Sequence, residues 1–149
     1  AYGEDAPKVL TAGSVEEEAE MLETLESFLD SENVILIGHN IKGFDIPFLA
    51  KRFMAQRRYV PKSLNFSGKK PWDIPHIDTM ELMRFGGGAS MSLRSACLML
   101  NIDDPKDSTC GSEVPALFRA GRVEEIGKYC AGDVIAEREV YNRIEEALR

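Results

Sequence analysis

Residues 34–45 read VILIGHNIKGFD, and this stretch decides the fold class. Its first four residues form a continuous apolar run, which favours a strand that is covered on both faces in a parallel sheet. A helix is expected soon afterwards, because Ile46, Leu49 and Phe53 are spaced three and four apart and Pro47 is tolerated in a first helical turn. The loop between them would lie at the carboxyl end of the strand, where open α/β sheets build their sites.

The rest of the chain continues the alternation of strands and helices. Ser14 and Glu17 form a capping box before a helix that carries Leu22, Leu25 and Leu29 on one face. The pattern predicts an α/β sandwich with a small, at least partly parallel sheet, and 149 residues are enough for one domain. The other expected elements are strands at residues 8–12 and 74–79 and helices around residues 93–100, 113–120 and 123–148.

The composition is that of a soluble globular protein, with 44% hydrophobic and 29% charged residues. The apolar run at residues 34–37 is far too short to span a membrane. Three cysteines without a C-x-x-C pair favour a reducing compartment, and we expect a cytoplasmic protein. The net charge of −7 argues against a nucleic-acid partner, but residues 51–70 carry seven bases and no acid. That basic segment is either a solvated loop or a contact for phosphates.

Two groups of polar residues stand where chemistry is expected. Asn40 and Asp45 follow the apolar run, although Asn40 could simply shape the turn and Asp45 could cap the helix. Tyr129 and Asp133 are four residues apart, so they share one face of the last helix. A carboxylate in that apolar stripe needs a cation, a metal or strong donors, since burying it alone is costly. The alternative is an edge position paired with an arginine.

Together these residues resemble the DEDD superfamily of 3′–5′ exonucleases, which has a ribonuclease-H-like fold. Residues 40–45 match its second motif, N-x(2–3)-F/Y-D, and residues 129–133 match its third, Y-x-x-x-D, whose tyrosine marks the DEDDy branch. The stretches GHNIKGFDIPFLAKR, HIDTMELM and SMSLRSACLMLNI also resemble stand-alone exonucleases related to the proofreading domain of family B DNA polymerases. The resemblance extends from about Val34 almost to the end of the chain. It implies a ribonuclease-H-like mixed sheet flanked by helices.

The resemblance implies 3′–5′ hydrolysis of nucleic-acid phosphodiester bonds by two divalent ions, Mg²⁺ or Mn²⁺. The substrate would be single-stranded 3′ ends. Tyr129 would orient the attacking water, Phe44 would pack against the terminal sugar or base, and Asn40 would help to shape the pocket. The residues expected in the site are Asp45, Tyr129 and Asp133 for catalysis, Asp45 and Asp133 also for the metal, and Asn40, Phe44, Arg57 and Arg58 for the substrate.

The first motif of the family, D-x-E on the first strand, does not have a counterpart at the expected place. Asp30-Ser31-Glu32 is the one D-x-E in the chain, and it comes too close before the second motif to fill that role. We therefore expect residues 1–149 to be one domain that is truncated at its N-terminus, lacks its first strands and is inactive as given. The exposed strand edge would invite a second copy of the chain. The alternative is a non-catalytic nucleic-acid-binding or scaffold protein on the same fold.

Two aromatic and two histidine side chains lie outside these motifs. Trp72 and Phe66 either stack on bases or pack within a loop or the core. His39 and His76 lack the spacing of zinc ligands, so structural roles are expected for both.

Overall fold

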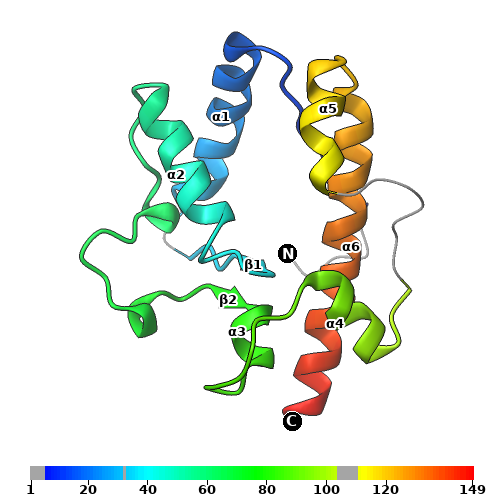
Figure 1. Cartoon of the computed structure of the whole chain (residues 1–149). Coiled ribbons are helices and arrows are strands. Elements are labelled where there is room, and N and C mark those ends of the chain that lie inside the picture. The colour runs from blue at the N-terminus through cyan, green and yellow to red at the C-terminus, as the bar shows by residue number, and fades with distance from the viewer. Residues whose placement is uncertain (1–5, 32, 104–110) are drawn as a thin grey trace. The chain divides into compact units, whose positions relative to one another are not determined.

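The computed structural model describes residues 6–31, 33–103 and 111–149 (Figure 1). The chain divides into two compact units, Ala19–Ser92 and a second unit that joins the residues up to Glu18 with Leu93–Arg149. Within the described residues, none of the helices combines the length and the apolar character that crossing a bilayer requires.

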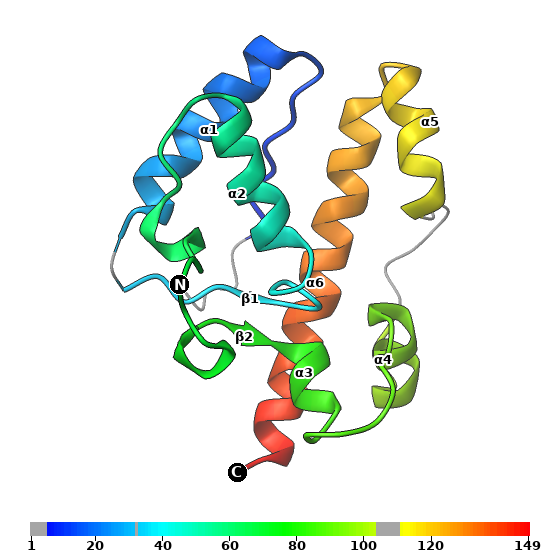
Figure 2. The ribbon, with the colours of Figure 1, turned by 60° about the vertical axis from the view of Figure 1, so that its left-hand side comes forward.

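The unit Ala19–Ser92 is built around a short parallel β-α-β arrangement. Its elements are most of α1 (Val15–Leu29), β1 (Ile37–Gly38), α2 (Asp45–Ala55), 3₁₀ turns at Lys62–Leu64 and Pro71–Asp73, β2 (Ile77–Asp78) and α3 (Thr79–Met83). β1 and β2 are parallel, with Ile37 opposite Ile77 and Gly38 opposite Asp78. In Figures 1 and 2, α1 and α2 lie side by side on the same side of the two strands. The parallel pairing brings the carboxyl ends of β1 and β2 to one edge.

The core of this unit lies between α1 and α2. Leu22 and Leu29 of α1 and Ile46 and Phe53 of α2 are buried together with Leu64. The four helical residues are positions that the three-and-four spacing predicted, and the other two predicted positions, Leu25 and Leu49, are partly buried against the same core. Leu64 was not predicted. Burying a side chain of this size stabilises the folded state by about 1.5–3 kcal/mol.

The start of α1 has the predicted capping box, except that Glu17 bonds back to the residue before Ser14 and not to Ser14 itself. The N–H of Glu17 donates to Oγ of Ser14 at 3.1 Å. The carboxylate of Glu17 reaches back to accept from the N–H of Gly13 at 2.6 Å. The N–H of Glu17 in the first turn and the N–H of Gly13 just before the helix thereby both have a hydrogen-bond acceptor.

The second unit is helical. It contains α4 (Leu93–Leu100), a 3₁₀ turn at Gly111–Glu113, α5 (Val114–Arg119) and α6 (Val123–Ala147). α4 and α5 both pack against α6. The expected helices of this region are thus confirmed, and residues 104–110 lie outside the described residues. The buried hydrophobic residues here are Ala96, Cys97, Ala136, Val140 and Ile144.

The strand expected at residues 8–12 is wrong, because these residues form no regular secondary structure. They cross α6 instead. A Cβ built on Gly127 would lie 2.9 Å from Cγ1 of Val9 and 3.0 Å from Cγ2 of Thr11. Gly127 therefore lets the segment approach the helix more closely than any side chain would allow.

The strands expected at residues 34–37 and 74–79 are much shorter than predicted. β1 begins only at Ile37, and Ile35 is 57% exposed rather than covered on both faces. The N–H of Leu36 donates to Nδ1 of His76 at 3.1 Å, so this donor goes to a side chain instead of a strand. β2 ends at Asp78 because the next residue, Thr79, already begins α3. The result is a helix-dominated α/β structure with a small parallel sheet.

Candidate functional site

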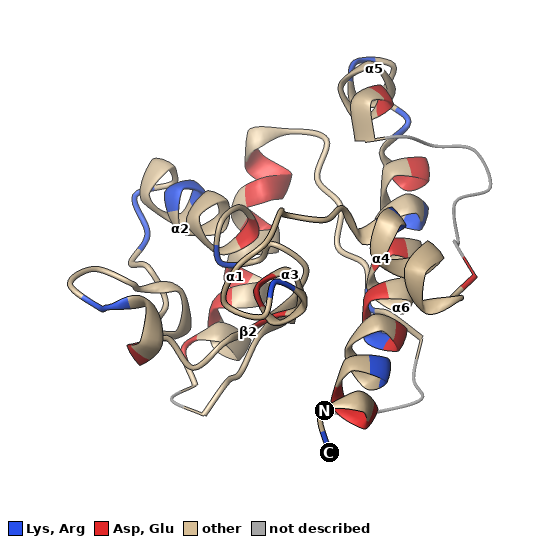
Figure 3. Cartoon of the chain, turned by 60° about the horizontal axis from the view of Figure 1, so that its bottom comes forward, with Lys and Arg blue, Asp and Glu red and all other residues tan. Residues whose placement is uncertain are grey.

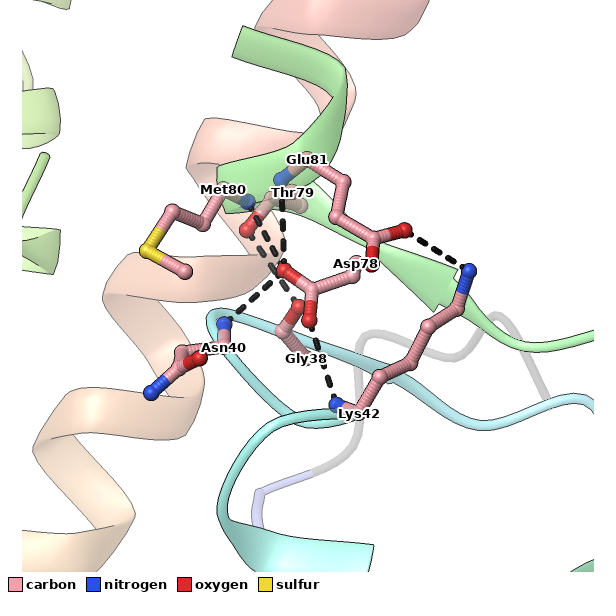
Figure 4. Close-up of polar contacts among 7 residues, drawn as sticks. All are labelled: Gly38, Asn40, Lys42, Asp78, Thr79, Met80 and Glu81. Carbon is pink, nitrogen blue, oxygen red and sulfur yellow. Dashed lines mark hydrogen bonds and ion pairs between the residues drawn. The ribbon is translucent and has the colours of Figure 1, made fainter. Parts of the chain in front are cut away.

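A buried carboxylate organises the loop that carries the second motif. Asp78 is 3% exposed and lies at the end of β2. Its Oδ1 accepts from the N–H of Asn40 at 2.9 Å, and its Oδ2 accepts from the N–H of Lys42 at 3.1 Å. Oδ1 also accepts from the N–H groups of Met80 at 3.0 Å and Glu81 at 3.4 Å. Figure 4 shows these four donors around the one carboxylate.

This arrangement explains why a buried carboxylate is tolerated at that position. An unpaired buried charge costs several kcal/mol, but hydrogen bonds from backbone N–H groups stabilise the charged form. Asp78 is at the same time the N-cap of α3 and the acceptor for the loop after β1. One side chain therefore joins the ends of both strands and fixes the second-motif loop to them.

Two side-chain contacts reinforce this connection. Nζ of Lys42 forms an ion pair with Glu81 at 2.9 Å. The ring of His39 contacts Oγ1 of Thr79 through Nδ1 at 3.0 Å and the carbonyl oxygen of Met91 through Nε2 at 2.7 Å. Because Nε2 faces a carbonyl oxygen, it is the protonated nitrogen that donates. The structural role expected for His39 is confirmed.

The backbone of the loop depends on Asn40 and on two glycines. Asn40 has φ +64°, and its carbonyl oxygen accepts from the N–H groups of Gly43 at 3.2 Å and Phe44 at 2.9 Å. A Cβ on Gly43 would lie 2.5 Å from Oδ1 of Asn40, and one on Gly38 would lie 2.5 Å from Cβ of Ile41. Asparagine tolerates the left-handed region better than most residues. The interpretation of Asn40 as a turn residue is confirmed.

α2 begins directly after this loop and presents Asp45. Phe44 holds the N-cap position and makes no side-chain cap bond, so the interpretation of Asp45 as the cap is wrong. Asp45 is the first residue of the helix, and its side chain is exposed. Loss of surrounding solvent raises the pKa of the Asp45 carboxyl above its ordinary value, and the negative charge of Asp78 raises it further, although a hydrogen bond from its own N–H lowers it.

The third-motif residues share one face of α6. Tyr129, Asp133 and Glu137 follow one another at intervals of four, and one carboxylate oxygen of each acid is buried. A Cβ on Gly111 would lie 3.7 Å from the hydroxyl of Tyr129. Glu137 was missed by the sequence analysis, although its distance of four from Asp133 could have indicated it.

The two motif carboxylates come from different compact units, with Asp45 in Ala19–Ser92 and Asp133 in the unit that contains α6. Within the described residues, no three His, Cys, Asp or Glu side chains are grouped so that they could hold a metal ion.

Comparison with known families decides the assignment. A family model described as "predicted 3′-5′ exonuclease related to the exonuclease domain of PolB" matches residues 3–148. The chain belongs to this family of predicted exonucleases. No curated protein and no solved structure gives a significant match.

Membership of this exonuclease family makes nucleic acid the substrate class. The basic residues after α2 are therefore candidate contacts for phosphates. Arg57 and Arg58 follow the C-cap of α2, whereas Phe44 and Asp45 lie at its start. Eleven helical residues separate the two ends by roughly 16 Å. The structure therefore does not bring the two arginines together with Phe44 and Asp45.

Arg58 is moreover engaged with α1. Its Nη2 lies 2.9 Å from a carboxylate oxygen of Glu26 and 3.6 Å from one of Glu23, and its Nε donates to Glu26 at 3.1 Å. Arg57 has φ +55° and an exposed side chain. Of the two arginines that were expected to contact the substrate of an exonuclease, Arg57 is the more accessible.

The remaining aromatic and histidine residues divide between core and surface. Phe66 packs against the core and lies 5.7 Å from the ring of His76, so its packing role is confirmed. His76 has the expected structural role, since it accepts from Leu36 and its Nε2 contacts the carbonyl oxygen of Ser63 at 2.6 Å. Trp72 is 76% exposed, with Nζ of Lys70 at 5.3 Å from its ring centroid. It is available to a ligand.

The D-x-E at residues 30–32 does not resemble a first exonuclease motif in structure. Asp30 lies just after α1, and its carboxylate accepts from the N–H of Lys62 at 3.3 Å. Asp30 is therefore an acid at a helix end. Glu32 lies outside the described residues.

Proposed function

We propose that the chain carries the second and third motifs of a DEDDy-type 3′–5′ exonuclease domain with a ribonuclease-H-like fold, and that it acts on single-stranded 3′ ends. The family match over residues 3–148 is the observation that carries this proposal. The parallel β1–β2 pair, with the second-motif loop at its carboxyl edge, supports it, because open α/β sheets place their sites there.

In this proposal each motif residue has a separate task. Asp45 and Asp133 provide carboxylate oxygens for metal, and Tyr129 holds the attacking water through its hydroxyl. Phe44 packs against the terminal sugar or base, and Asn40 sets the turn that presents it. The Asp78 bonds support these roles by holding the loop rigidly before substrate arrives.

The residues present fit a divalent ion in kind. Asp45 and Asp133 offer hard oxygen donors of the type that Mg²⁺ and Mn²⁺ prefer. Bound ions would supply water activation and stabilisation of the leaving oxygen.

The chain supplies fewer carboxylates than the proposed mechanism uses. The resemblance implies four, two of them from the D-x-E motif. Asp45 and Asp133 stand at matching positions, but Asp30 lies at the end of α1 and does not take the place of the first motif. Two carboxylates do not hold two ions in the fixed geometry of in-line displacement. The 149-residue chain alone is therefore expected to hydrolyse little or nothing.

The test is hydrolysis of a 5′-labelled single-stranded oligonucleotide with Mn²⁺. The 149 residues are compared with the whole reading frame in which they lie, and variants Asp45→Asn and Asp133→Asn are made in the active form. We expect stepwise shortening from the 3′ end that either substitution abolishes. Asp30→Asn is the matched control and should leave the rate unchanged. Full activity of Asp45→Asn would reject the proposed site.

A second candidate is a nucleic-acid-binding protein without catalysis. It needs the basic residues 51–70, which carry seven Lys and Arg and no acid, but no metal site. Binding of the oligonucleotide without hydrolysis by either form of the chain would select this alternative.

A further inference from the structure

One face of α2 is exposed and takes no part in the core, and we call its residues Phe44, Phe48 and Lys51 the stripe. Phe44 is 62% exposed and Phe48 is 55% exposed, and the side chain of Lys51 is also exposed. Positions four and seven residues after the first lie on the same helical face. Ile46 and Phe53, on the opposite face, are buried in the core. The helix thus has one face for folding and a second, different face that remains in solvent.

The two exposed rings form a continuous surface. The centroids of Phe44 and Phe48 are 6.0 Å apart, and their planes differ by 9°. Single exposed apolar side chains are common on protein surfaces, but two exposed rings stacked together form a contiguous apolar surface, which is typical of an interaction site. Flat aromatic surfaces of this kind are where unpaired bases stack, and stacking accepts every base because each has a π face.

We propose that Phe48 and Lys51 extend the substrate site along α2, with Phe48 stacking on a base and Lys51 contacting a phosphate of the same strand. This rests on the proposed function only in that Phe44, at the start of the stripe, receives the terminal nucleotide. The stripe then binds at least two unpaired nucleotides without regard to base identity. Paired bases in a duplex do not present their faces and are not bound here.

The charges around the stripe favour nucleic acid over a protein partner. Lys51 lies about 10 Å beyond Phe44 along the helix axis. From Lys51 to Lys70 the chain has seven Lys and Arg and no acid. Figure 3 shows these bases on α2 and on the segment that follows it. Two aromatic rings with Lys51 on the same helical face match the bases and a phosphate of a single strand.

The test measures binding without catalysis. Fluorescence anisotropy with EDTA present compares a labelled oligodeoxythymidylate of about a dozen nucleotides with an abasic oligomer of equal length and charge. The 149-residue chain is compared with Phe48→Ala, Phe48→Tyr and Lys51→Ala. Phe28→Ala is the matched control, because Phe28 is an exposed phenylalanine on α1. Circular dichroism confirms that each variant is folded.

We expect Phe48→Ala to weaken binding of the oligodeoxythymidylate by about 5- to 150-fold and to leave the abasic oligomer unaffected. Phe48→Tyr should retain the affinity, since it keeps the aromatic face. Lys51→Ala should weaken both oligomers and lower the salt slope by about 0.7.

Several results would overturn the inference. They are no binding of the oligodeoxythymidylate by the unaltered chain, an effect of Phe48→Ala no larger than that of Phe28→Ala, or equal losses on both oligomers. The stripe would then belong to a protein partner or to none. Failure of the exonuclease assay with this binding pattern intact rejects the proposed function and leaves the stripe as a single-strand binding surface, so the two failures are distinguishable.

Discussion

The N–H of Asn40 donates to Oδ1 of Asp78 at 2.9 Å across a separation of 38 residues in the sequence. Because Asp78 also accepts from Lys42, the loop after β1 is held from the end of the neighbouring strand. The placement of Phe44 and Asp45, which follow this loop, thus depends on a residue outside the motif.

Asp78→Ala should lower the free energy of unfolding by about 3 kcal/mol or more, since it removes the shared acceptor of several N–H groups and the cap of α3. Asp78→Asn keeps one acceptor oxygen and should cost less. Urea denaturation followed by circular dichroism measures both. Asp73→Ala, at an exposed position, is the control and should stay within about 0.5 kcal/mol. Equal effects of Asp78→Ala and Asp73→Ala would show that the buried bonds contribute nothing.

Gly38→Ala should lower the melting temperature by several degrees, because the new Cβ would lie 2.5 Å from Cβ of Ile41, an atom that is attached directly to the backbone and cannot rotate away. Gly87→Ala is the matched control, since no atom lies within 4 Å of its Cβ position. Thermal unfolding of the two variants side by side measures the difference. A melting temperature for Gly38→Ala equal to that of Gly87→Ala would contradict the close approach.

Asp45→Asn should slightly stabilise the protein at neutral pH, by at most about 0.5 kcal/mol because the side chain is exposed. The folded-state pKa of Asp45 is raised, so its charged form opposes folding. At a pH below the unfolded-state pKa, Asp45 is protonated in both states and costs nothing. As the pH rises through the folded-state pKa, the carboxyl ionises and the folded state loses a little stability. The gain from the substitution should therefore vanish in acid. Denaturation midpoints measured between pH 3 and pH 7 test this, and a gain that grows toward low pH would contradict it.

Much of the unit Ala19–Ser92 could be predicted from the sequence, because the apolar spacing within α1 and α2 directly reflects their buried faces. The ends of β1 could not, since the N–H of Leu36 bonds to a histidine 40 residues away. Asp78 is an intermediate case. Its position three residues before Glu81 indicates a helix start, but its bonds to the loop depend on the register of β1 with β2, which no local pattern contains.

The candidate site could be predicted in part. The motif itself indicates Asn40 and Asp45 as candidates. The exposure of the Phe48 ring is known only from the structure, because periodicity alone treats Phe48 as another apolar helix position. Arg58 was chosen for its charge, and its pairing with Glu26 depends on the packing of α1 against α2.

Ile35, with more than half of its surface exposed next to β1, is a candidate edge for pairing with a second chain. We expect the protein to associate as its concentration rises and Ile35→Lys to reduce this association. Sedimentation velocity over a hundredfold range of concentration measures it. Val15→Lys, at an exposed position on α1, is the control. A chain that stays monomeric throughout, or association that Ile35→Lys leaves unchanged, would contradict the prediction.

We propose that Asp45 and Asp133 serve one hydrolytic reaction, and a double-mutant cycle on the rate of 3′-end hydrolysis tests this proposal most directly. The active reading frame is assayed with Mn²⁺ as Asp45→Asn, Asp133→Asn and the double variant. The effects of substituting residues that act as a unit are not additive, so we expect the double variant to lose no more rate than either single variant. Losses that multiply, or hydrolysis that survives either substitution, would contradict a shared site.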